Sequence, residues 1–244
     1  MRRIQRVILP KVAQSYLSKR QLAANEKHKN GELNIERDWK NARQTKPLKA
    51  VVTTLQTMMG LRQRCMYCLD SHGADIEHFR PKAIYPKRMY HWPNLLLCCT
   101  ECGRFKGNKF PMSGRQALLI DPTHEDPWKH LDFDPVTGNI SARFDLHLDD
   151  WSAKGTATVD VLKLDRREAL SSGCLKTLRH LCAIVERALL GAAIAAPTLV
   201  LELHNADDHG LLAWCFGNRG RTIHPFNDLH QQHPGVWRQC CRAI

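Results

Sequence analysis

The chain has 244 residues, enough for one large domain or two small ones, and its 43% hydrophobic content supports a buried core. The net charge of +12 favours an anionic partner such as nucleic acid, although a solvated basic surface would give the same composition. The most apolar run, residues 188–201, is interrupted by Pro197 and is shorter than the ~20 residues of a membrane span, so we read it as a buried helix and its exit. The N-terminus lacks a secretory pattern, which makes a cytoplasmic protein the expectation.

Residues 1–62 predict a basic helical N-terminal region. Helical periodicity covers 11–29, 33–44 and 47–61. In the first helix we expect an apolar stripe made of Val12, Tyr16, Leu17, Leu22 and Ala23. Residues 1–50 hold thirteen Lys and Arg against four Asp and Glu, so these helices either contact phosphates or present a solvated face.

Two C-x-x-C pairs, Cys65/Cys68 and Cys99/Cys102, follow this region. A two-residue gap lets both thiolates of a pair point at one ion, and two pairs complete a closed tetrahedral site. The spacing therefore predicts a structural Zn²⁺, which can supply on the order of 10–16 kcal/mol of folding free energy in a small module.

The residues between the two pairs carry groups suited to cutting phosphodiesters. Residues 74–79 predict a strand, on which Asp75 and Glu77 share one face and His78 lies on the other. A basic loop follows, and residues 92–98 predict a short helix that contains Asn94.

This stretch resembles the Cys-containing HNH endonucleases. The resemblance rests on the first C-x-x-C, Glu77-His78, the N-L-x-x-x-C-x-x-C run from Asn94, and Lys106 four residues after the last Cys. The strings IEHFRPK, W-x-N-L and K-x-x-K-F-P, with downstream matches at 119–122 and 132–140, bring it closer to the PtuB-like HNH nucleases of Septu and retron-linked phage-defence systems. The resemblance covers roughly residues 60–170 and implies an α+β, mainly helical fold: a zinc-stabilised ββα-metal core at 63–115, with helices on the N- and C-terminal sides.

The resemblance implies a role for each matching residue. His78 would be the general base, Asn94 would orient His78 or the loop, and Glu77, then Asp75, would bind a catalytic Mg²⁺ or Mn²⁺. The cations expected to bind nucleic acid, with DNA preferred, are Arg80, Lys82, Lys106 and Lys109. The family's partners would be a PtuA-like ATPase and a retron reverse transcriptase with its hybrid DNA.

One position departs from the family pattern. Many HNH sequences carry His or Asn directly after the last Cys, as a ligand of the catalytic metal, and this chain has Gly103. Three explanations remain: a neighbour such as Asn108 takes the role, fewer protein ligands hold the metal, or catalysis is weakened or absent.

Residues 116–244 predict a mixed segment that turns helical from about 156 and serves for partner docking. Residues 136–140 predict a hairpin turn, and Asp165 is expected to cap the helix that follows. The remaining His and Cys residues have no ligand spacing, so a second metal site is not expected. Two functions stay open: a metal-dependent nuclease, and a zinc-stabilised nucleic-acid-binding or adaptor subunit whose catalytic site has decayed.

Overall fold

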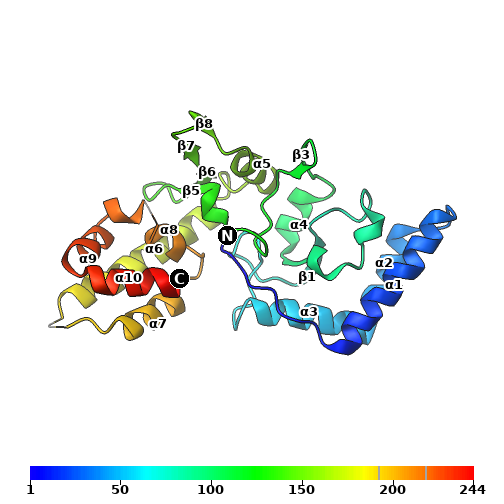
Figure 1. Ribbon diagram of the computed structural model, residues 1–244, viewed down its shortest axis with the longest axis horizontal. Helices are drawn as coiled ribbons and strands as arrows, with labels where there is room; N and C mark the ends of the chain where they lie inside the picture. The colour runs from blue at the N-terminus through cyan, green and yellow to red at the C-terminus, as the bar shows by residue number, and fades with distance from the viewer. Residues whose placement is uncertain (192, 218) are drawn as a thin grey trace. The chain divides into compact units, whose positions relative to one another are not determined.

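The computed structural model describes residues 1–191, 193–217 and 219–244 and divides the chain into two compact units (Figure 1). The N-terminal unit is Arg3–Glu125, and the C-terminal unit joins Met1–Arg2 to Asp126–Ile244. Both units combine helices with short antiparallel strand pairs, and helices predominate. The expectation of an α+β, mainly helical chain is therefore confirmed.

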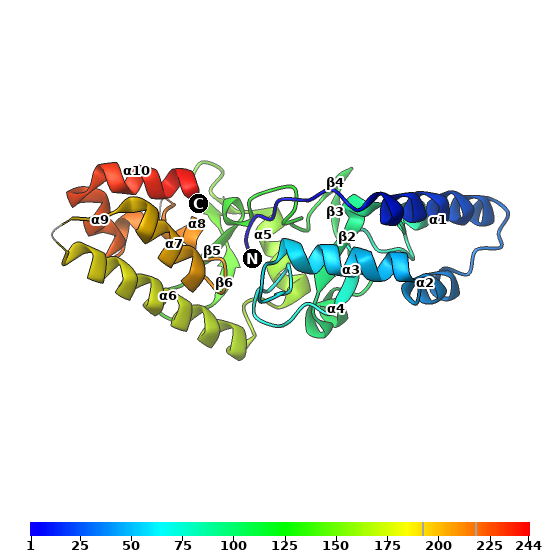
Figure 2. The same cartoon turned by 90° about the horizontal axis from the view of Figure 1, so that it is seen from below.

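Three helices begin the N-terminal unit: α1 (Lys11–Lys29), α2 (Ile35–Arg43) and α3 (Lys46–Met58). α1 packs against α3 (Figure 2). The apolar stripe expected on α1 was misplaced, because Val12 and Leu22 are 73% and 69% exposed. Leu17 is buried as expected, but the other buried positions are Ala13 and Ala24, so α1 faces its neighbours with Leu17 and two alanines.

A two-stranded hairpin forms the centre of this unit. β1 (Asp75–His78) pairs antiparallel with β2 (Leu95–Cys98), with Glu77 opposite Leu96 and His78 opposite Leu95. The predicted strand is confirmed, but the predicted helix over 92–98 is wrong: a 3₁₀ turn, η2 (Trp92–Asn94), leads directly into β2. All four residues of β2 are buried, and such a short apolar run has no period that separates strand from helix.

The helix α4 (Thr100–Lys106) follows β2 at once, so the order in this region is strand, strand, helix. Cys99 is the N-cap of α4, and its Sγ accepts a hydrogen bond from the Cys102 amide at 3.4 Å. Gly107 ends the helix with a φ of 45°, a region that glycine enters without steric cost. The rest of the unit contains η1 (Pro86–Arg88) and the pair β3 (Met112–Ser113) and β4 (Gln116–Ala117).

The C-terminal unit starts with small hairpins and continues as helices. β5 (Leu131–Phe133) pairs with β6 (Ile140–Ala142), so the predicted turn at 136–140 is confirmed. The other elements are η3 (Pro127–Lys129), β7 (Phe144–Asp145), β8 (Asp150–Trp151), α5 (Ala153–Leu162), α6 (Glu168–Leu189), α7 (Ala196–Ala206), α8 (Leu212–Cys215), η4 (Gly220–Thr222), α9 (Phe226–Gln232) and α10 (Pro234–Ala243).

Two expectations in this unit were wrong. Asp165 does not cap α6, which begins after Arg167 without a side-chain cap; Asp165 pairs with Arg166 instead. The apolar run 188–201 is not one helix: it spans the end of α6 and the start of α7, with Ala192 outside the described residues.

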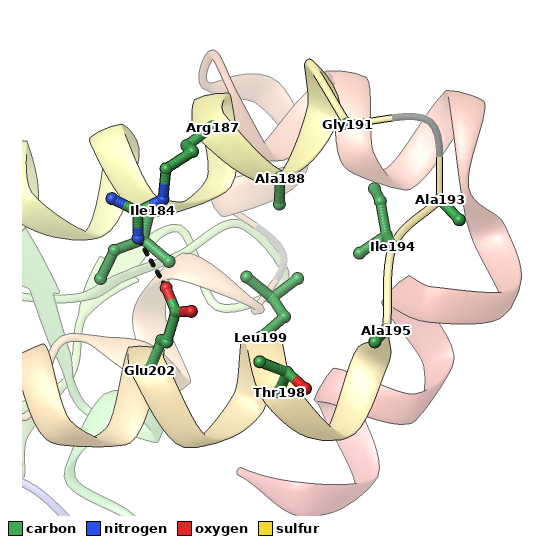
Figure 3. Close-up of a pocket in the computed structure, with 10 residues that line it drawn as sticks. All are labelled: Ile184, Arg187, Ala188, Gly191, Ala193, Ile194, Ala195, Thr198, Leu199 and Glu202. Atoms are coloured by element: carbon green, nitrogen blue, oxygen red, sulfur yellow. Dashed lines mark hydrogen bonds and ion pairs between the residues drawn. The ribbon is translucent and has the colours of Figure 1, made fainter.

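The helices α6 and α7 pack against each other in the C-terminal unit. Figure 3 shows Leu199 of α7 beside Ile184 and Ala188 of α6, with an Arg187–Glu202 ion pair of 2.6 Å joining the two helices. Among the described residues, none of the helices combines the length and apolar composition that a membrane crossing requires.

Candidate metal centre and neighbouring polar site

The four cysteines of the two C-x-x-C pairs converge in the N-terminal unit. Their sulfur atoms all lie within 4.8 Å of one another, and all four residues are buried. A tight turn carries the first pair: the Leu69 amide donates to the Cys65 carbonyl at 3.0 Å, and the Met66 amide donates to the Leu97 carbonyl at 2.9 Å. The start of α4 supplies the second pair, so β2 connects the two halves of the cluster.

This donor set fits a metal such as zinc. A Zn–S bond of about 2.3 Å in a tetrahedron places neighbouring sulfurs about 3.8 Å apart. The sulfurs of Cys68 and Cys99 are 3.9 Å apart. The thiol of Cys98 donates to the Cys99 carbonyl at 3.2 Å and is not one of the four converging sulfurs, so Cys98 is a buried neighbour and not a fifth ligand.

The crowding of the sulfurs changes their proton affinities. Hydrogen bonds from Cys102 and from Cys65 hold the pKa of Cys99 far below its usual range. Hydrogen bonding with Cys65 and Cys68 in turn raises the pKa of Cys102. A lowered pKa favours the thiolate of Cys99, which is the form that binds metals.

Glu77 lies on β1 and is tied to Lys106, the last residue of α4. The Lys106 Nζ lies 2.9 Å from Glu77 Oε1 and 2.7 Å from the His78 carbonyl oxygen. Lys106 is fully buried. Burial raises the pKa of Glu77, and the neighbouring Lys106 charge opposes that increase.

His78, the next residue, is enclosed on the other face of β1. It is 5% exposed, and its ring packs edge-on against Trp39 of α2 with 4.4 Å between ring centroids. The Nε2 atom lies 2.9 Å from the Met89 carbonyl oxygen, and because a carbonyl only accepts, Nε2 carries the proton and Nδ1 keeps its lone pair. Burial lowers the pKa of His78 to about 3, so the imidazole is neutral at physiological pH.

Asn94 holds the loop between the strands. Its Oδ1 accepts from the Arg80 amide at 2.8 Å, and its Nδ2 donates to the carbonyls of Arg80 and Arg88 at 3.0 and 2.9 Å. These three bonds pair both polar atoms of the Asn94 side-chain amide with backbone groups. Asn94 therefore fixes the path of the loop that carries Met89, the partner of His78.

The residues expected to hold a hard divalent ion do not converge. Asp75 is half-exposed and pairs with Arg43 at 2.7 Å, while Glu77 is engaged by Lys106. Asn108 is exposed beyond the end of α4. A Cβ at Gly103 would lie 3.7 Å from Glu77 Oε2, so position 103 faces this carboxylate but offers no ligand. As they lie, these side chains do not fit Mg²⁺ or Mn²⁺, which require several oxygen ligands in a regular shell.

The expected phosphate-binding cations occupy different environments. Lys109 is exposed, and Arg80 is half-buried with its guanidinium over the rings of Tyr85 and Phe110. Lys82 pairs with Glu36 at 2.7 Å. Lys106 differs from the expectation, because its ammonium is buried on Glu77 and does not reach the surface where a phosphate would bind.

Sequence reasoning missed three contributors to this site. Trp39 encloses His78, the Met89 carbonyl accepts a hydrogen bond from its imidazole, and Arg43 neutralises Asp75. Two of them lie on α2, more than thirty residues before β1, where no local pattern links them to the site. Met89 acts through its backbone, which any residue type would supply.

Comparisons with known proteins give a distant and partial relationship. No family model matches the chain. It is 32% identical over 112 residues to the Septu protein PtuB of Bacillus thuringiensis, covering 44% of this chain and 38% of that one. It is also 32% identical over 136 residues to the Septu protein PtuB of Bacillus mycoides strain KBAB4, covering 43% and 44%.

A third match has a different name. The chain is 36% identical over 134 residues to the Septu protein PtuA of the same B. mycoides strain, covering 42% of this chain and 18% of that one. The chain spans less than half the length of each of these curated relatives. It is thus a distant relative, over part of its length, of proteins named as Septu components.

Proposed function

We propose that this chain is the nuclease component of a Septu-type anti-phage defence complex, hydrolysing phosphodiester bonds of nucleic acid, with DNA as the preferred substrate. The observation that carries the proposal is His78: a neutral imidazole at the end of β1, oriented by the Met89 carbonyl, in the same unit as the buried four-thiol cluster. The partial similarity to PtuB supports the defence setting.

His78 would act as the general base through Nδ1, the nitrogen that keeps its lone pair. In the free protein its pKa of about 3 makes it a weak base. A bound phosphodiester would bring negative charge close to the imidazole and raise that pKa towards the working pH, since an opposite charge favours the protonated form. We assign the zinc a structural role, because four thiolates complete a closed tetrahedron.

The partner would be a PtuA-like protein. The match to a segment that makes up 18% of a protein named PtuA supports this pairing. In that longer protein, a region similar to the present chain is part of the same polypeptide as the rest of PtuA. A separate chain related to that region would dock to the rest of such a protein. The C-terminal unit is our candidate for this docking.

A second function is favoured by a specific observation. Lys106 neutralises Glu77, and position 103 is a glycine. Both features fit an adaptor that binds nucleic acid through a zinc-stabilised fold without cutting it. In that case the His78 imidazole is a packed core residue against Trp39.

Cleavage of supercoiled plasmid and single-stranded DNA tests the choice. The zinc-loaded wild type and the control variant His91→Ala are each assayed alone and with a PtuA-like partner, with and without Mg²⁺. His91 is an exposed histidine of the same loop. The nuclease proposal expects wild type and His91→Ala to cut the DNA alike. DNA binding without cutting under every condition would support the adaptor.

A further inference from the structure

The contacts of Lys106 define a cation site that is built from oxygen atoms. Three acceptors surround its Nζ: Glu77 Oε1 at 2.9 Å, the His78 carbonyl at 2.7 Å and the Gly107 carbonyl at 3.5 Å. An ammonium has three donors, so the acceptors match its hydrogen-bonding capacity. A carboxylate with backbone carbonyls is also the ligand chemistry that proteins offer to hard cations.

The burial of Lys106 makes these contacts obligatory. Its side chain is 0% exposed, whereas the Glu77 side chain is 17% exposed. A buried ammonium is tolerated only where it is paired and hydrogen-bonded, because it has lost its hydration. Glu77 supplies the compensating charge, and the two groups form a locally neutral unit between β1 and the end of α4.

The far oxygen of Glu77 faces a residue that cannot coordinate. A Cβ built at Gly103 would meet Glu77 Oε2 at 3.7 Å and Cys98 Sγ at 3.9 Å, both ordinary contacts. A Cβ at 103 would therefore fit beside the carboxylate, and this chain supplies no side chain there. The other carboxylate of β1, Asp75, is committed to Arg43.

We propose that the Lys106 ammonium occupies the place beside the Glu77 carboxylate that a hard divalent ion would otherwise take. The glycine at 103, which offers no metal ligand, belongs to the same arrangement. A dication at Glu77 would face the buried Lys106 ammonium, a like charge, so the two cations exclude each other. The assignment rests on the proposed function for its location beside the catalytic His78, but its chemistry concerns cation binding alone.

The test is a titration of the full zinc-loaded chain with Mn²⁺ in the absence of nucleic acid. The electron paramagnetic resonance signal of the free Mn²⁺ reports how much Mn²⁺ is bound. In wild type, any binding of Mn²⁺ should be unchanged by Glu77→Gln. The double variant Gly103→Asn/Lys106→Met should bind one Mn²⁺ at least tenfold more tightly than wild type, and adding Glu77→Gln should abolish this binding. Zinc content and circular dichroism verify that each variant is folded.

A single variant keeps the test decisive if removing Lys106 prevents folding. Gly103→Asn retains Lys106, and the added Cβ meets only ordinary contacts, so the variant should fold and still bind no Mn²⁺ through Glu77. Binding of one Mn²⁺ by wild type or by Gly103→Asn, lost on Glu77→Gln, would overturn the assignment. Because this titration contains no nucleic acid, its outcome is separate from the cleavage assay that decides the nuclease proposal.

Discussion

The Nε2 atom of His78 donates to the Met89 carbonyl oxygen across 2.9 Å, joining the end of β1 to the loop that precedes β2. This bond selects the tautomer of the imidazole and fixes its plane. Met89 is itself held in place because Asn94 hydrogen-bonds both Arg80 and Arg88, its neighbour in the chain. The position of the candidate base therefore depends on the loop as much as on the strand.

The low pKa of His78 predicts a pH-dependent stability. The pKa is about 3 in the folded chain and near the ordinary 6.5 in the unfolded chain, so the unfolded state binds more protons between these values. The stabilisation is complete above pH 6.5 and is lost as the pH falls towards 3, by up to about 1.4 kcal/mol per pH unit. Urea unfolding of wild type and His78→Gln from pH 7.5 to 4.5 measures it.

The variant shares every other titrating group with wild type, including the thiolates of the zinc cluster. The difference between the two unfolding free energies should therefore shrink as the pH is lowered. A difference that is constant with pH would show that His78 titrates alike in both states.

Asn94 should be more important for the loop than its size suggests. Replacing Asn94 with Ala removes three hydrogen bonds from a residue that is 4% exposed, and should cost about 2–4 kcal/mol of unfolding free energy. Asn94→Asp should cost at least as much, because a carboxylate oxygen would face the Arg80 and Arg88 carbonyls. Urea unfolding provides the values.

The exposed Asn108 supplies the matched control, and Asn108→Ala should change the unfolding free energy by less than about 0.5 kcal/mol. Equal small effects at both positions would argue against a loop-holding role for Asn94.

The four-thiol cluster predicts one tightly held zinc per chain. Cys99→Ser should lose the metal and much of the stability, since structural zinc supplies on the order of 10 kcal/mol in small modules. Cys98→Ala is the control, because Cys98 is equally buried and adjacent but its thiol donates to a backbone carbonyl. Elemental analysis and thermal unfolding check both. Retention of one zinc by Cys99→Ser would contradict the assignment.

Binding to DNA should be strongly salt-dependent, as the net charge of +12 suggests. Each phosphate contact contributes about −0.9 to the slope of log K against log salt concentration. Lys109→Ala, which removes an exposed cation near the site, should reduce that slope by about one for every DNA sequence tested. Arg187→Ala is the comparison, because Arg187 pairs with Glu202 in the C-terminal unit (Figure 3). Identical slopes in wild type and Lys109→Ala would exclude a phosphate contact there.

Local signals in the sequence predicted the elements that carry a period or a fixed spacing. The helices of the first sixty residues, the strand at Asp75–His78 and the cluster of four cysteines all follow from such signals. The strand Leu95–Cys98 did not, because it is buried on both faces and pairs with β1, a partner that no local pattern reveals.

The burial of polar side chains was harder to predict from the sequence than the helices and strands were. Lys106 was expected to reach phosphates, since a lysine among other cations usually does, yet its position at the end of α4 directs it into the interior. The expectation failed because burial of a charge depends on a partner distant in sequence, here Glu77. The enclosure of His78 by Trp39 is tertiary in the same way.

The central claim is that His78 performs chemistry in a chain that also binds nucleic acid, and two quantities measured on one preparation test it most directly. Zinc-loaded His78→Ala, with its PtuA-like partner, is compared with wild type for DNA affinity and for the single-turnover cleavage rate. Our account predicts affinities within about twofold and a cleavage rate at least about 10²-fold lower, the usual contribution of a general base. Cleavage at the wild-type rate by His78→Ala would contradict it.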